Sequence, residues 1–251
     1  MKNKILTVAF VSLAFPGMAY SDTIFGVYAG AGVWSTDATG DFQFVGSEGN
    51  NEIDLSDDLD LEGDNNSVFY VALEHPLPFI PNIKLQRSEM TADSSTTLSS
   101  EITFDNVTYP VNEQVKTTLD LSHTDATLYY EILDNWVSLD AGLSVRVFDG
   151  GIDIKSVSDP SLSASQSLSA PIPMLYGKAR FDLPFSGFSV AAELNTLGVV
   201  NDMTIKAAYE SPLRFGVEAG YRTFSVSLDD IDDLDTGIDI DGAYMALTLH
   251  I

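Results

Sequence analysis

Apolar and polar residues alternate along much of this chain after residue 22. In residues 137–147, valine, leucine and alanine occupy every odd position, whereas the even positions hold serine, glycine, Asp140 and Arg146. Because successive side chains of a strand point to opposite faces, this segment predicts a strand with one apolar and one polar face. Similar segments recur, each about as long as a bilayer is thick. A closed barrel in lipid, apolar outside and polar inside, explains the set better than a soluble sandwich does.

The alternation and the turns that interrupt it predict an all-β fold, a single antiparallel up-and-down barrel of about ten transmembrane strands. The predicted strands are residues 23–35, 67–75, 82–91, 116–133, 136–148, 172–183, 187–197, 203–210, 213–228 and 238–251. Short links follow the second, fourth, sixth and eighth strands, and the other links are long except the one between the seventh and eighth. Short periplasmic turns and long outer loops are typical of bacterial barrels, so both termini should face the periplasm.

The first 21 residues have the pattern of a cleavable signal peptide. Lys2 and Lys4 precede an apolar run at residues 5–15, and Ala19-Tyr20-Ser21 places small residues at the −3 and −1 positions. We therefore expect a signal peptide at residues 1–21 and the barrel at residues 22–251. Export and spanning strands together predict the outer membrane of a Gram-negative bacterium.

The composition narrows the chemistry that this chain can perform. It has no cysteine, so it lacks a disulfide framework, a thiol nucleophile and a thiolate metal site. The formal charge of −25 argues against nucleic-acid binding, because phosphate would be repelled. A mean hydropathy of +0.08 is ordinary for a barrel in which only alternate residues face lipid. We expect no cofactor.

Three longer strings resemble a known family. They are residues 22–34, residues 72–76 with 81–83, and residues 129–136. They are similar to a family of small proteobacterial outer-membrane β-barrel proteins, known mainly for fold and location and without an established biochemical activity. The last residues also resemble the final strand of outer-membrane barrels, although most of those end in Phe and this chain ends in Ile251. The resemblance implies a barrel and an outer-membrane location, and it implies no activity.

The predicted inward face of the strands carries a nearly balanced set of charges. They are Glu74, Lys84, Asp125, Glu131, Asp140, Arg146, Lys178, Arg180, Asp182, Glu193, Lys206, Glu210, Arg214, Glu218 and Arg222. A ten-stranded barrel is only slightly wider than the eight-stranded kind, whose interior side chains can fill. We expect these groups to pair across a largely occluded lumen, with a narrow water-filled path as the alternative.

Acidic residues are concentrated in the predicted outer loops. Carboxylates at one- and two-residue spacing can gather a divalent cation through oxygen ligands. The candidate metal ligands are Asp57, Asp58, Asp60, Asp230, Asp232 and Asp233. The 54–64 segment does not match the twelve-residue calcium loop, so we expect a solvated acidic loop and no metal site, with cation binding as the alternative. The serine-rich residues 156–170 predict a mobile, exposed loop.

Three functions remain open at this stage. The first is a structural or surface-interaction barrel whose partners are outer-membrane lipids and, during insertion, the barrel-assembly machinery. The second is a narrow porin-like channel for small solutes or ions. The third is a hydrolase at the outer rim, for which His123 beside Asp125 would have to activate a nucleophile. Because no lipase, deacylase or omptin-like motif accompanies His123, we expect no enzyme activity.

Overall fold

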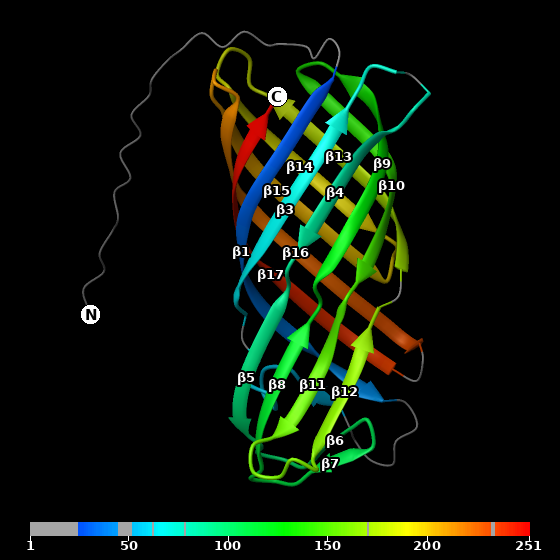
Figure 1. Cartoon of the computed structure of the whole chain (residues 1–251), viewed down its shortest axis with the longest axis vertical. Helices are drawn as coiled ribbons and strands as arrows, with labels where there is room; N and C mark the ends of the chain where they lie inside the picture. The colour runs from blue at the N-terminus through cyan, green and yellow to red at the C-terminus, as the bar shows by residue number, and fades with distance from the viewer. Residues whose placement is uncertain (1–24, 45–51, 62, 78, 170, 232–233) are drawn as a thin grey trace, which may run out of the picture.

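The structure is a computed structural model that describes residues 25–44, 52–61, 63–77, 79–169, 171–231 and 234–251. It consists of an antiparallel barrel that continues at one end into an extension built of shorter strands (Figure 1). The barrel strands are β1 (Gly26–Phe44), β3 (Asn65–Glu74), β4 (Asn82–Ser88), β9 (His123–Asp134), β10 (Val137–Phe148), β13 (Pro171–Asp182), β14 (Phe188–Thr196), β15 (Val200–Glu210), β16 (Phe215–Ile231) and β17 (Leu234–His250). Among the described residues, no helix is long and apolar enough to cross a membrane.

The barrel closes because β1 pairs on one side with β3 and on the other side with β17. The remaining strands pair with their neighbours in chain order, so the topology is up-and-down and antiparallel throughout. Closure leaves no open edge in the barrel wall, which satisfies its backbone hydrogen bonds without water. The predicted ten-stranded barrel is confirmed.

The two faces of the wall differ as the alternation predicts. On β10, Leu143 and Val145 face outward and are exposed, whereas Asp140 and Arg146 are buried. Leu247 on β17 is 68% exposed although it is a large apolar residue. In water such a belt would be costly, but it matches the outward apolar band of a barrel in lipid.

The extension continues four barrel strands beyond the belt. It contains the sheet of β5 (Thr91–Thr97), β8 (Gln114–Asp120), β11 (Gly150–Ser156) and β12 (Ser163–Leu168). The hairpin of β6 (Ile102–Phe104) and β7 (Val107–Tyr109) lies at its far end, and β2 (Ile53–Asp54) pairs with the outer half of β1 (Figure 1). The short turns and the C-terminus lie at the opposite end of the molecule, so the extension is on the extracellular side.

The extension has a hydrophobic core of its own, which the sequence analysis did not predict. The core joins the sheet to the outer halves of β1, β16 and β17 through buried residues such as Phe42, Phe104, Ile154 and Phe224. Apolar residues in the presumed loops supply it. In residues 55–61, Leu55, Leu59 and Leu61 are buried between acidic neighbours.

Several predicted boundaries were wrong for this reason. The predicted loop at residues 156–170 contains β12, and the predicted strands at residues 82–91 and 116–133 are each divided, into β4 and β5 and into β8 and β9. The first strand runs to Phe44 rather than to Ser35. The last predicted loop is strand as well, because β16 reaches Ile231 and β17 begins at Leu234. Alternation continues there, since Ile238 and Ile240 are buried between exposed or half-buried positions.

Candidate functional site: the charged lumen

The outermost charged layer of the lumen is organised around two arginines. Arg146 on β10 donates Nε to Asp125 Oδ1 (2.8 Å) and Nη2 to Asp125 Oδ2 (2.7 Å). The same Nη2 donates to Asp202 Oδ2 on β15 (2.6 Å). Arg222 on β16 donates Nε and Nη2 to the two oxygens of Asp202 at 2.9 and 2.7 Å. This set of four, two cations and two anions, bridges β9, β10, β15 and β16 and is buried throughout. We call it the arginine layer.

Aromatic rings cover the arginine layer on its extracellular side. The guanidinium of Arg222 lies 4.5 Å from the ring centroid of Trp34, and that of Arg146 lies 5.5 Å from Phe224. His123 packs between Phe148 and Phe224 with ring centroids 5.4 and 6.0 Å away. A cation over an aromatic face gains electrostatic attraction that is larger when water is excluded.

A second layer lies further into the barrel. Lys84 forms an ion pair with Glu193, and Lys206 Nζ lies 2.9 Å from Glu218 Oε2. Tyr70 donates a hydrogen bond to Glu218 at 3.3 Å, and its ring lies 5.3 Å from Lys84 Nζ. Each charge therefore has a partner of opposite sign, which offsets part of the cost of removing it from water.

The periplasmic half of the lumen holds the other predicted charges except Arg214. Lys178 pairs with Asp140 at 3.1 Å, and Arg180 pairs with Asp182 at 2.8 Å. The remaining contacts are hydrogen bonds, from Tyr129 Oη to Glu74 (2.7 Å), from Asn82 Nδ2 to Glu131 (3.3 Å) and between His250 Nδ1 and Glu210 (3.3 Å). The charged side chains become less buried toward the periplasmic end of the barrel, where Glu131 is exposed.

A small cavity lies at the boundary between the arginine layer and the second layer. Its volume is about 20 Å³, and its lining includes Lys84, Glu193, Asn195 and Arg222. A water molecule needs roughly 10–15 Å³ of such volume, so this space suits one water rather than a solute. Asn195 Oδ1 has no hydrogen-bond partner among the described groups, and a water molecule here would supply one.

His123 lies at the start of β9, below the extension instead of on an open rim. It is completely buried, and its Nδ1 lies 2.9 Å from Leu121 O. His123, Asp125 and Asp202 place nitrogen and oxygen atoms within 4.8 Å of one another, a spacing that could suit a metal ion. Both carboxylates already bind guanidinium groups, however, so the arginines occupy the positions that a cation would need.

The structure describes four of the six acidic residues considered as metal ligands, and it places them in two different elements. Asp57, Asp58 and Asp60 lie in the turn that follows β2, Asp230 lies within β16, and Asp232 and Asp233 fall outside the described residues. In that turn, Asp58 Oδ2 accepts a hydrogen bond from Asp54 N at 3.0 Å, so it has a structural role. This hydrogen bond stabilises the turn in which Leu55 and Leu59 are buried.

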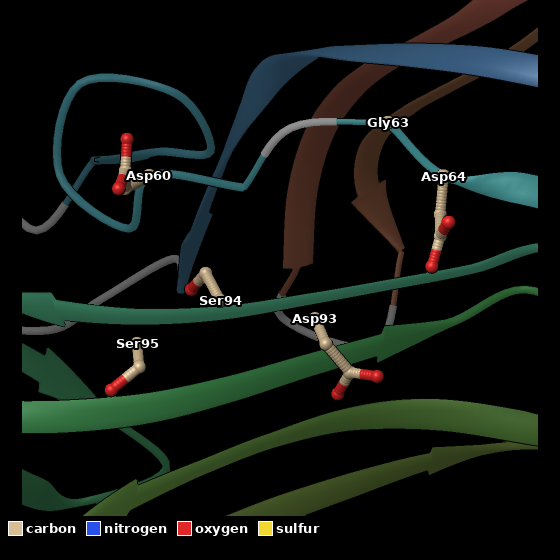
Figure 2. A pocket seen from close by; sticks show the side chains of 6 residues that line it. All are labelled: Asp60, Gly63, Asp64, Asp93, Ser94 and Ser95. Atoms are coloured by element: carbon tan, nitrogen blue, oxygen red, sulfur yellow. The ribbon is translucent and has the colours of Figure 1, made fainter.

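A pocket of about 350 Å³ lies beside this turn, and Asp60, Gly63, Asp64, Asp93, Ser94 and Ser95 line it. Figure 2 shows the carboxylates of Asp60 and Asp64 at opposite ends of the pocket. Cation coordination needs several oxygens within bonding distance of one point. The described side chains around this pocket do not form such a set.

Arg214 was predicted to face the lumen and does not lie there, and the prediction omitted Asp202, a member of the arginine layer. Arg214 is exposed in the turn between β15 and β16, with φ at 65°, because β16 begins only at Phe215. Asp202 was missed because the predicted strand began one residue after it. The alternation could have revealed it, because Asp202, like Lys206 and Glu210, occupies an even-numbered position on the inward face of β15.

Comparison with known proteins gives similarity in fold. No family model and no curated protein matches the sequence. Among solved structures, the chain is similar to the outer membrane protease OmpT from Escherichia coli, at 10% identity over 90% of this chain and 96% of that one, with a TM-score of 0.47. It is also similar to the translocator domain of the autotransporter NalP from Neisseria meningitidis, at 12% identity, 92% and 89% coverage and a TM-score of 0.40. A third is Ail of Yersinia pestis, at 12% identity, 89% and 99% coverage and a TM-score of 0.27.

At these values the comparisons carry no argument about function. The fold is established by the strand pairing and by the apolar belt of the chain itself. This protein is a closed transmembrane β-barrel of ten strands.

Proposed function

We propose that this protein is a closed outer-membrane barrel that holds a folded, acidic extension outside the cell, with a structural or surface-interaction role. The extension is the part of the molecule that a partner outside the cell would meet. The barrel anchors it, since its apolar belt contacts outer-membrane lipids.

The bridging contact of Arg146 supports the closed lumen. Its side chain is completely buried, and it binds one carboxylate on β9 and another on β15, which is separated from β10 by two strands of the wall. A hydrated solute passing through would have to separate these pairs. Separating a buried ion pair costs about 3–5 kcal/mol, and the second layer would have to open as well.

We further propose that the protein is not an enzyme. A rim hydrolase would need His123 open to substrate, with a carboxylate free to assist it. In the described residues His123 is buried under aromatic rings, and Asp125 is held by both nitrogens of a guanidinium. The geometry therefore supports a stabilising role for the cluster.

The route to the membrane is part of the proposal. Residues 1–21, outside the described part of the chain, would be removed on export, and the barrel-assembly machinery would insert residues 22–251. Mass spectrometry of the protein isolated from outer membranes tests this step, with Asp22 expected as the first residue. Retention of Lys2 and Lys4 would contradict it.

Planar-bilayer recording of the purified full-length mature protein tests the closed lumen. We expect no step currents in molar potassium chloride, whereas a trimeric porin recorded in the same bilayers gives them. Reproducible steps from the wild-type protein would overturn the closed lumen and favour the narrow channel. Insertion is checked separately by protection of the belt from protease in vesicles.

A further inference from the structure

At two places in the wall of the extension, neighbouring strands are not paired because the barrel strands between them do not continue beyond the barrel. We call these places seams. The first lies above β3, between β5 and the outer half of β1, because β3 begins only at Asn65. The second lies above β14 and β15, between β12 and the outer end of β16. There β14 ends at Thr196 and β15 begins at Val200, while β16 continues to Ile231.

The chain closes the first seam itself. Leu55 N donates to Gly40 O on β1 at 2.9 Å, and Ser94 Oγ on β5 donates to Leu59 O at 2.5 Å. The start of β5 is held as well, since Thr91 N donates to Asn66 Oδ1 at 2.9 Å. The segment after β2 therefore lies between the two strands and binds both.

At the second seam, β12 presents an edge with which no other described strand pairs. Ser156 N donates to Leu162 O, which makes this pair a hydrogen-bonded one in the antiparallel register of β11 and β12. Because such pairs alternate, Ala164, Gln166 and Leu168 bond to β11, and the other three residues direct their N–H and C=O groups away from it. These three are Ser163, Ser165 and Ser167, and their backbone groups bond to no other described residue.

Nothing in β12 protects this edge. The strand contains no charge and no proline, its register with β11 is regular, and Ser163, Ser165 and Ser167 are exposed. Natural sheets protect free edges with lysines, prolines or bulges, because a flat bare edge pairs with other chains. Beside it, the partly buried Leu168 and Val226 lie against the core, where apolar side chains of an added strand would pack.

Charge indicates the kind of strand that fits. The described residues of the extracellular part, 35–44, 52–61, 63–66, 87–122, 149–169, 223–231 and 234–243, contain 22 Asp and Glu residues but only three Lys and Arg residues. A second copy of the chain would bring an equally acidic surface and be repelled. A segment with lysine or arginine at alternate positions would be attracted.

From these observations we propose that β12 is a docking edge for an extended, basic segment of a partner protein, which adds a strand to the extension by backbone pairing. This mode gives affinity through main-chain hydrogen bonds and selectivity through alternate side chains. The inference rests on the proposed surface role of the extension. Conductance tests the closed lumen and peptide binding tests the edge, so the two can fail separately.

Peptide binding to the full-length mature protein in detergent tests the proposal. The probe is a fluorescent nine-residue peptide of alternating lysine and valine, and the control peptide alternates glutamate and valine. We expect saturable binding of the basic peptide that weakens with added salt, and at least tenfold weaker binding of the acidic one. Absence of saturable binding by the basic peptide, or equal binding of both, would overturn the proposal.

Substitutions of Ser165 locate the binding. Ser165→Pro removes one outward N–H and leaves every bond to β11, so we expect at least a tenfold loss of affinity, whereas Ser165→Thr should bind as the wild type does. If the proline disturbs the circular dichroism, Ser165→Lys replaces it and should weaken binding through repulsion. Unchanged binding by a folded Ser165→Pro or Ser165→Lys variant would overturn the proposal. So would a wild-type dimer that Ser165→Pro abolishes, since that assigns the edge to a second copy.

Discussion

Arg146 Nη2 lies 2.6 Å from Asp202 Oδ2, although β10 and β15 are separated in the barrel wall by β13 and β14. The contact joins distant parts of the wall, and Asp202 receives Arg222 on its other side. A buried charge that is bound from two directions holds the barrel cross-section fixed, because no single partner can move without exposing the others.

Removing Arg146 should destabilise the barrel strongly. In Arg146→Met, Asp125 loses both hydrogen bonds from the guanidinium and remains buried. We expect a loss of about 3–5 kcal/mol in the free energy of unfolding, measured with urea in lipid vesicles. The matched control is Arg87→Met, whose ion pair with Asp149 is exposed and should contribute less than about 1 kcal/mol. Equal effects of the two substitutions would show that the arginine layer does not stabilise the barrel.

The position of the lipid belt can be tested with a charge on the outer face. Leu143 on β10 is 63% exposed and lies in the belt, whereas Thr39 is exposed on the outer half of β1, beyond it. Leu143→Lys should cost about 2–4 kcal/mol in unfolding from bilayers, because a lysine at the midplane loses its hydration. Thr39→Lys should cost little. Similar values for both would show that the belt is not in contact with lipid.

The extension should be separable from the barrel in stability. Phe104 is almost fully buried, and its ring lies 5.7 Å from Phe42 in an edge-to-face arrangement. Phe104→Ala should destabilise the extension by about 3–5 kcal/mol through the cavity it leaves. We expect rapid protease cleavage in the extension, while the barrel stays folded on unheated gels. Loss of the folded barrel band would show that the two parts fold as one unit.

Tyr109 should ionise late in an alkaline titration. Burial raises the pKa of Tyr109 to about 12 from 10.0, and its hydroxyl donates to Ile154 O at 2.7 Å. Because the folded value lies above the unfolded one, its contribution to stability is complete below about pH 10 and is lost as the pH rises toward 12. The difference in ultraviolet absorbance between the wild type and Tyr109→Phe isolates this group. A midpoint near 10 would contradict the burial of Tyr109.

The sequence indicated the inward face of the barrel strands, but it did not indicate the extension. Side chains alternate between the two faces of a strand. The even-numbered positions of Lys206 and Glu218 therefore placed both on the inward face, even where the predicted strand boundaries were wrong. The partners were not predictable, because Lys84 and Glu193 are 109 residues apart and meet only through the curvature of the wall. Asp202 was not predicted because the expected start of its strand lay one residue after it.

By itself, the sequence determined the secondary structure of the barrel, its strand number and the side of the wall on which each alternating residue lies. These follow from local geometry, since lipid accepts only a wall with its backbone bonds closed and its apolar side chains outward. The tertiary structure alone decided which charges bind across the lumen and that the apparent loops fold together. Residues such as Leu59 and Ile154 read as isolated apolar positions in polar segments, and they become a core only when strands from distant parts of the chain converge outside the membrane.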